Sequence, residues 1–282
     1  MIGNRNMNTS QGFARRLAGY LSVPLGVFAV LSACSEAGSN TAAPTAVKVE
    51  CKWTVGDEYR YRTLANINGT MKLPGESNPT PVNVDLEMVM KYSVVKPTVR
   101  DSTEIMINTE SASLVLGDNR IPAPTSPQTV VRLDPAGRIV SISGTDRTMG
   151  LSGVNINTLM VLLVPVFPEA EMKVGQEWSS ETNVASIGRK LSVRNVLLDV
   201  ERVNEHDTVR VKQSFELLPM EGEAANTGGI TARGEAVSNF SVKDGRLVKS
   251  QAEMAVKSEE VAEKDSPSMD AKIKLDVNLL PK

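Results

Sequence analysis

Apolar and polar side chains alternate strictly along several segments of the chain. The pattern is clearest in residues 84–94, 209–217 and 271–279, and the apolar set of the second segment includes Gln213. Successive side chains of a β-strand point to opposite faces, so each segment forms a strand with one apolar and one polar face. Antiparallel sheets contain such two-sided strands, whereas parallel strands are apolar on both faces. The pattern therefore predicts a mainly β protein with an antiparallel sheet.

Short turn signals separate the predicted strands. Lys243–Arg246 contains Asp-Gly, the strongest short hairpin signal, and Asp134–Gly137 is a longer turn of the same kind. Strands joined by such turns are neighbours in space. We therefore expect strands that follow one another in sequence to pair within the sheet.

One apolar segment, residues 155–164, lacks the alternation. Ser152 or Asn155 is a suitable helix cap, and Pro165 and Pro168 would end the segment. We predict a short apolar helix that packs on the concave face of the sheet. A fully buried strand is the alternative, because a short apolar run suits either state.

The order of elements recurs along the chain. Val55–Tyr59 reappears as Val174–Trp178, and in each case the Gly-Asp/Gln-Glu-aromatic segment precedes a strand. Later landmarks recur in the same order at shorter offsets, such as Gly137 and Gly245. We predict pseudo-repeats at about 52–143 and 172–257, with a final strand at 271–280, although chance similarity among hairpins is an alternative. The expected fold is a curved, half-barrel-like antiparallel sheet built from two related β-meanders.

The N-terminal segment has the features of an export signal. Its only charged side chains before Glu36 are three arginines, and residues 17–33 are uncharged. The run ends in Leu31-Ser32-Ala33-Cys34, which resembles the lipobox of bacterial lipoproteins. The resemblance implies cleavage before Cys34 and its diacylation, which holds a protein on the membrane. A transmembrane anchor or a core helix is the alternative, because 17 residues are near the lower limit for crossing a bilayer.

This signal sets the predicted domain organisation and location. We expect a signal peptide at 1–33, the lipidated Cys34 with a flexible tether at 34–50, and a single β-rich domain at 51–282. Residues 35–49 are rich in small and polar side chains, which is typical of a tether. Ser35 follows the cysteine, and the resemblance implies attachment to the outer membrane, facing the periplasm, in a Gram-negative cell.

Composition excludes some classes of partner. Removal of residues 1–33 takes away three basic side chains and no acidic one, which leaves 28 against 33 and a net charge of −5. Aromatic residues make up 4% of the chain. This balance gives no electrostatic or stacking basis for binding nucleic acid. Cys51 has no obvious disulfide partner once Cys34 is lipidated, and we expect it to pack as a small apolar residue.

The combination of an anchor and a bent sheet resembles the bacterial LolA-type half-barrel lipoproteins and lipoprotein carriers. The likeness over 52–280 is one of pattern and composition. It implies a non-enzymatic envelope protein that binds a lipid or another hydrophobic molecule. Six apolar residues are the candidate ligand-binding positions: Met88, Met90, Leu159, Met160, Leu163 and Phe167. Methionine adapts to irregular ligands, but the same residues would fill an ordinary core equally well.

Two other functional classes stay open. An enzyme would need a site formed only by the fold, because the sole histidine, His206, lies in a predicted turn and no phosphate loop or nucleophile motif is present. We therefore expect no catalytic residue, no metal site and no cofactor. A structural or assembly lipoprotein would instead bind another envelope protein and have a fully packed interior.

Overall fold

The computed structural model describes most of the chain after residue 45. The described residues are 46–49, 52–72, 76, 78–99, 101–116, 119–123, 125, 128–144, 156–161, 163–184, 188–220, 230–258 and 268–281. Cys34 and Cys51, and with them the predicted signal and lipidation site, lie outside these ranges. Contacts divide the chain into Met1–Thr41 and Ala42–Lys282, and the second unit contains all the described strands and the helix.

Twelve strands and one helix make up this unit. The first meander contains β1 (Glu58–Lys72), β2 (Thr80–Val95), β3 (Thr103–Leu116), β4 (Asn119–Pro122), β5 (Thr129–Leu133) and β6 (Ile139–Ser143). The helix α1 (Ile156–Val161) follows. The second meander contains β7 (Glu177–Val184), β8 (Arg189–Val203), β9 (His206–Pro219), β10 (Ile230–Ser241) and β11 (Leu247–Ser258), and the last strand is β12 (Ser268–Leu279).

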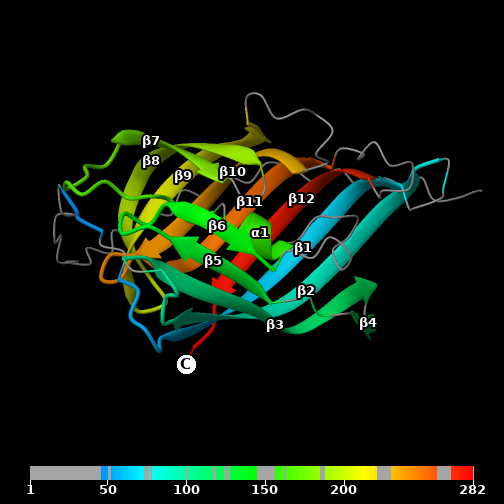
Figure 1. The fold of residues 1–282 in the computed structure, drawn as a ribbon, viewed down its shortest axis with the longest axis horizontal. Helices are drawn as coiled ribbons and strands as arrows, with labels where there is room; N and C mark the ends of the chain where they lie inside the picture. The colour runs from blue at the N-terminus through cyan, green and yellow to red at the C-terminus, as the bar shows by residue number, and fades with distance from the viewer. Residues whose placement is uncertain are drawn as a thin grey trace, which may run out of the picture. The chain divides into compact units, whose positions relative to one another are not determined.

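All strands belong to one antiparallel sheet that is nearly closed. Its order is β6-β5-β3-β2-β1-β12-β11-β10-β9-β8-β7. The short strand β4 pairs with the C-terminal end of β3, residues 113–116. The two ends of this order approach each other, since Cα atoms of β6 and β7 lie within 8 Å (Figure 1). No backbone ladder joins these two strands in the described sheet. The predicted fold class is confirmed, and the sheet closes further than a half-barrel.

The alternation of side chains decides which face of the sheet is the core. In β1 every second residue from Tyr59 to Ile67 is buried, and the residues between are mostly exposed. The same pattern holds in the segments predicted in β9 and β12, and in β2 it holds from Leu86 to Met90. The buried residues form one cluster on the inner face, and α1 belongs to it through Leu159, Met160 and Val161. The predicted helix is confirmed over six residues, so the alternative of a buried strand is not adopted.

The two meanders begin with the same hydrogen bonds. The amide of Gly56 donates to the carbonyl of Val94 in β2, and that of Gly175 donates to Leu197 in β8, at 2.9 and 2.7 Å. The carbonyls of the next residues, Asp57 and Gln176, accept from the amides of Val94 and Leu197 in return. Both glycines have a positive φ, +96° and +83°, which a residue without a side chain adopts at little cost. The repeated segment is therefore a repeated structure as well as a repeated sequence.

The order of strands shows how the two meanders are joined. Both meanders run in the same direction around the sheet, and β12 pairs with β1 on one side and β11 on the other. The equivalent junction, between β7 and β6, has no strand in between. One junction is thus completed by backbone hydrogen bonds and the other is a seam between two strand edges.

The packed unit begins earlier than residue 51, where the sequence analysis places its boundary. Val47 and Val49 are buried in the core, and Val47 exchanges two backbone hydrogen bonds with Met172. Small and polar neighbours make 35–49 look like a uniform tether, but these two valines alternate with Lys48 and pack like a strand. The predicted tether is therefore too long at its C-terminal end.

Candidate functional site

The six apolar residues singled out in the sequence lie together in the interior. Met88 and Met90 are on the inner face of β2, while Leu159 and Met160 belong to α1. Leu163 and Phe167 follow the helix, and all six are at most 8% exposed. They belong to a single cluster with the inner face of the sheet. The structure thus gathers these residues, and their role as ligand contacts or as core stays a prediction.

Aromatic rings attach the segment after α1 to the second meander. The ring of Phe167 packs edge to face with Phe240 of β10, with centroids 5.3 Å apart. Trp178 of β7 lies 6.2 Å from the same ring, and its indole N–H donates to the carbonyl of Val166 at 2.9 Å. The helix itself has only six residues, too few for a stable isolated helix. Packing on the inner face therefore stabilises this segment.

A band of uncharged polar side chains crosses the apolar inner face. We call Thr63, Asn195, Gln213, Ser238 and Ser250 the polar band, and all five are 0% exposed. Asn195, Gln213, Ser238 and Ser250 come from four consecutive strands, β8 to β11. Asn195 and Gln213 are direct partners across β8 and β9, as are Ser238 and Ser250 across β10 and β11. Thr63 lies two strands beyond Ser250, next to Val277 of β12.

Only part of the polar band is hydrogen-bonded. The hydroxyls of Ser238 and Ser250 are 2.8 Å apart, and the Ser238 hydroxyl donates to Oε1 of Gln213 at 3.4 Å. Four of its buried atoms have no hydrogen-bond partner among the described residues: Oγ1 of Thr63, Oδ1 and Nδ2 of Asn195, and Nε2 of Gln213. Sequence reasoning missed this band, although Gln213 among the apolar positions of its strand was a signal.

A buried cation lies at the end of the inner face. Arg189, the first residue of β8, is 3% exposed. Its Nε donates to the carbonyl of Ile230 at 2.9 Å, and its Nη1 donates to that of Gly188 at 3.1 Å. No carboxylate pairs with it among the described residues. The guanidinium thus connects the first residues of β8 and β10 through backbone carbonyls.

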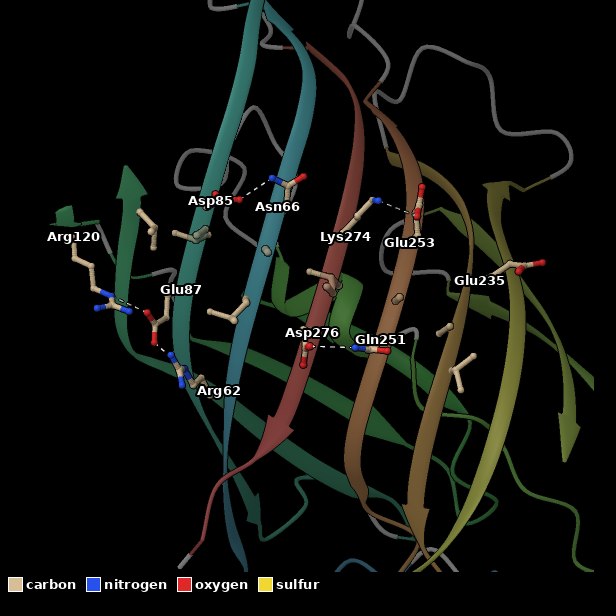
Figure 2. Close-up of a pocket in the computed structure, with 18 residues that line it drawn as sticks. Arg62, Asn66, Asp85, Glu87, Arg120, Glu235, Gln251, Glu253, Lys274 and Asp276 are labelled. Atoms are coloured by element: carbon tan, nitrogen blue, oxygen red, sulfur yellow. Dashed lines mark hydrogen bonds and ion pairs between the residues drawn. The ribbon is translucent and has the colours of Figure 1, made fainter. Parts of the chain in front are cut away.

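The outer face carries a separate groove of about 690 Å³. It crosses β2, β1, β12, β11 and β10, with α1 behind these strands on the opposite face of the sheet (Figure 2). Polar residues stand in register along it, and the row from β10 to β2 is Glu235, Glu253, Lys274, Asn66 and Asp85. The lining contains five carboxylates and three cationic side chains, so the groove is acidic by two charges.

Some of the charged side chains in the groove form ion pairs, and others have no partner of opposite charge among the described residues. Glu87 accepts hydrogen bonds from Arg62 and Arg120 at 2.8 and 2.9 Å. Partial burial raises the pKa of the Glu87 carboxyl group. The two guanidinium groups lower it by more, so the pKa of Glu87 lies below its usual value. Asp85 and Asp276 bond only to side-chain amides and have no cationic partner among the described residues. Leu64, 41% exposed, lies in register between Asp276 and Glu87.

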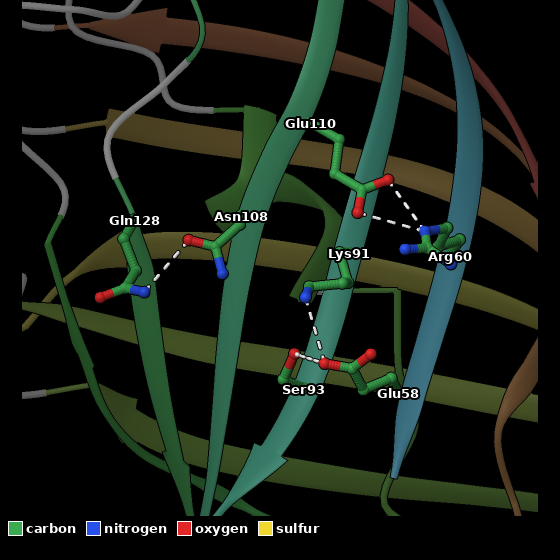
Figure 3. A network of polar contacts seen from close by, with 7 residues as sticks. All are labelled: Glu58, Arg60, Lys91, Ser93, Asn108, Glu110 and Gln128. Carbon is green, nitrogen blue, oxygen red and sulfur yellow. Dashed lines mark hydrogen bonds and ion pairs between the residues drawn. The ribbon is translucent and has the colours of Figure 1, made fainter. Parts of the chain in front are cut away.

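A second polar network lies further along the outer face, on β1, β2 and β3 (Figure 3). Glu110 accepts from Nε of Arg60 at 2.9 and 3.1 Å, and Lys91 contacts Glu58 at 3.1 Å. The hydrogen bond and charge of Lys91 hold the pKa of Glu58 below its ordinary value. These pairs are largely exposed and contribute little to stability each.

The described residues contain no group of three or more His, Cys, Asp and Glu side chains arranged to hold a metal ion. His206 begins β9, directly after a two-residue turn in which Asn204 and Glu205 both have positive φ. The turn predicted at 204–207 is therefore shorter than expected, because His206 already pairs with Val203 of β8. No described helix is long and apolar enough to cross a membrane.

Comparisons with known proteins found similarity in fold alone. No family model matches the chain, and no curated protein matches it. A solved structure of lipovitellin, described for its lipid-protein interactions, aligns at 13% identity with a TM-score of 0.47. The alignment covers 82% of this chain but only 26% of that one. A protein of Bacteroides fragilis with a YmcC-like fold aligns at 10% identity with a TM-score of 0.27, covering 84% of this chain and 100% of that one.

Proposed function

We propose that this protein is a lipid-anchored protein of the bacterial envelope that binds a lipid or another hydrophobic molecule on the inner face of its sheet. The observation that carries the proposal is an apolar inner face enclosed by a sheet whose last junction, between β6 and β7, lacks a backbone ladder. Opening this seam would break no strand pairing of the described sheet. The proposal assigns the protein no catalytic step.

The α1 segment is the element that a ligand would displace. It is held by side-chain packing on the inner face, and its six residues have little helical stability of their own. Met160 within the helix, and Met88 and Met90 in the same core cluster, can adapt to a guest of irregular shape. The sequence supplies the other half of the proposal, since the lipobox at Leu31–Cys34 implies an anchor, and Ser35 implies the outer membrane.

Extraction of bound molecules tests ligand binding. Residues 35–282, which include the whole compact unit from Ala42, would be produced in a bacterium, purified, and extracted with organic solvent for mass spectrometry. We expect one lipid class to be recovered in near-stoichiometric amounts from independent preparations. Clean protein that also fails to bind the apolar dye N-phenyl-1-naphthylamine would contradict the proposal.

Metabolic labelling tests the anchor separately. Full-length chain grown with an alkyne analogue of palmitate should incorporate the label and enter the membrane fraction. Cys34→Ser should remove the label, and Cys51→Ser, the matched control, should retain it. Equal labelling of the two variants, or none in the parent chain, would contradict anchoring at Cys34.

The outer groove favours a second function, the docking of another envelope protein. Its uncompensated carboxylates, Asp85 and Asp276, suit a partner with basic side chains, and the exposed Leu64, in register with Asp276, adds apolar contact. A photo-crosslinking residue at position 64 should capture one envelope protein, and Asp85→Asn with Asp276→Asn should reduce the yield. The same residue at position 218, exposed on β9, is the control. Equal capture at both positions would argue against this docking site.

A further inference from the structure

The polar band on the inner face carries unmet hydrogen-bonding capacity inside an apolar interior. A buried polar atom without a partner costs about 1–3 kcal/mol, and most buried polar groups in proteins are therefore paired. Within the part of the chain that the structure describes, both polar atoms of the Asn195 amide lack a partner, as does Nε2 of its cross-strand neighbour Gln213. Apolar residues of similar size would avoid this cost. The presence of amide side chains at positions 195 and 213 therefore indicates a role other than stabilising the fold.

We infer that the polar band binds the uncharged polar group of an amphiphilic ligand, an ester, amide or hydroxyl attached to an acyl chain. The inference rests on the proposed function, since it places part of the same ligand. The side-chain N–H groups of Asn195 and Gln213 can donate to a ligand carbonyl. Oδ1 of Asn195 can accept a hydrogen bond from a hydroxyl or amide of the ligand. The surrounding apolar residues would contact the acyl chain of the ligand.

The chemistry of the band also limits the charge of the bound group. None of its five side chains is ionisable in the physiological range, and all are fully buried. An ionised head group brought to this position would lose its hydration with no opposite charge to compensate it. The buried Arg189 lies at the far end of β8, six residues from Asn195, which is about 20 Å along a strand. The band therefore suits a neutral group.

Two probes and three variants test the inference in the chain from residue 35 onward. The probes are monoolein, which has ester and hydroxyl groups, and N-phenyl-1-naphthylamine, which lacks them. Asn195→Leu and Gln213→Met remove the polar atoms with little change in volume. Asn68→Leu, on the exposed face of β1, is the matched control. Dye fluorescence, dye displacement by monoolein, and the melting temperature of the ligand-free protein are measured for each.

We expect each inner-face variant to bind monoolein about tenfold or more weakly, the effect of losing one or two hydrogen bonds in an apolar site. Dye affinity should stay within about twofold. The melting temperature should stay the same or rise in Asn195→Leu, which removes two unpaired polar atoms, and should change little in Gln213→Met, which removes the unpaired Nε2 together with the 3.4 Å hydrogen bond from Ser238. Asn68→Leu should change neither affinity.

The remaining outcomes overturn one proposal or the other. Unchanged monoolein binding in both inner-face variants would overturn the inference and leave the proposed function intact if the dye still binds. A lower melting temperature in both variants would mean that the amides serve the fold, through buried water or otherwise, and would also overturn the inference. A parent chain that binds neither probe would overturn the proposed function and the inference together.

Discussion

The guanidinium of Arg246 lies 4.9 Å from the centroid of the Tyr59 ring. It also contacts Asp244 at 2.8 Å, while the Tyr59 hydroxyl donates to Asp57 at 2.7 Å. Trp53 packs edge to face on the same tyrosine, with centroids 6.5 Å apart. The first strand of the first meander is thus tied to the last hairpin of the second by a cation, a carboxylate and two rings.

Arg246→Ala should destabilise the fold by about 1–2 kcal/mol, because a largely buried cation is lost from an aromatic face. Urea unfolding followed by tryptophan fluorescence measures the change. Arg210→Ala removes an exposed arginine from the outer face of β9 and should change stability by less than about 0.5 kcal/mol. A similar effect of both substitutions would mean that the Tyr59 contact contributes nothing specific.

Stability should fall in acid partly through Glu104. The hydrogen bond from Thr98 at 2.6 Å, aided by Arg132 at 3.2 Å, lowers the pKa of Glu104 below 4.5, although burial opposes the shift. A lowered pKa in the folded state gives stability that is present above about pH 4.5 and is lost as the pH falls through the folded value.

The variant Glu104→Gln tests this pH dependence. We expect it to be about 1–2 kcal/mol less stable than the parent at pH 7, with the difference shrinking below pH 4.5. Urea unfolding between pH 3 and 7 gives the curve. For Glu216→Gln, at an exposed position of β9, the free energy of unfolding should vary with pH as it does in the parent. A difference that stays constant with pH would contradict the assigned charge interaction.

The equivalent glycines of the two meanders should respond alike to substitution. No atom lies within 4 Å of a Cβ built on either Gly56 or Gly175, so backbone strain at positive φ is the only cost. We expect Gly56→Ala and Gly175→Ala each to lose about 1–2 kcal/mol in chemical unfolding. Asparagine tolerates this conformation better, so Gly56→Asn should cost less. Costs that differ widely between the two alanine variants would argue against equivalent turns.

The contribution of α1 to the core can be measured through Leu159, which is 0% exposed. Leu159→Ala should destabilise the ligand-free protein by about 2–5 kcal/mol through lost burial and a cavity. Leu218→Ala, at a 47% exposed position of β9, should change stability by less than about 0.5 kcal/mol. Equal stability of the two variants in thermal unfolding would show that α1 is not part of the packed core.

The amino-acid pattern was enough to predict which face of several strands is buried and how each of the two meanders opens. Period-two alternation in β2, β9 and β12 identifies the apolar face, because side-chain direction is a local property of an extended backbone. The repeated glycine segments predicted the repeated strand openings for the same reason, since positive φ at Gly56 and Gly175 is a local requirement.

Which strands are neighbours, and which polar groups find hydrogen-bond partners, depends on how the whole sheet assembles. Alternation does not specify a partner, so the position of β12 between β1 and β11 and the seam between β6 and β7 depend on long-range packing. Gln213 on an apolar face could be paired or unpaired, and its cross-strand neighbour Asn195 becomes visible only in the assembled sheet. The candidate site depends on such non-local contacts, which the sequence alone does not fix.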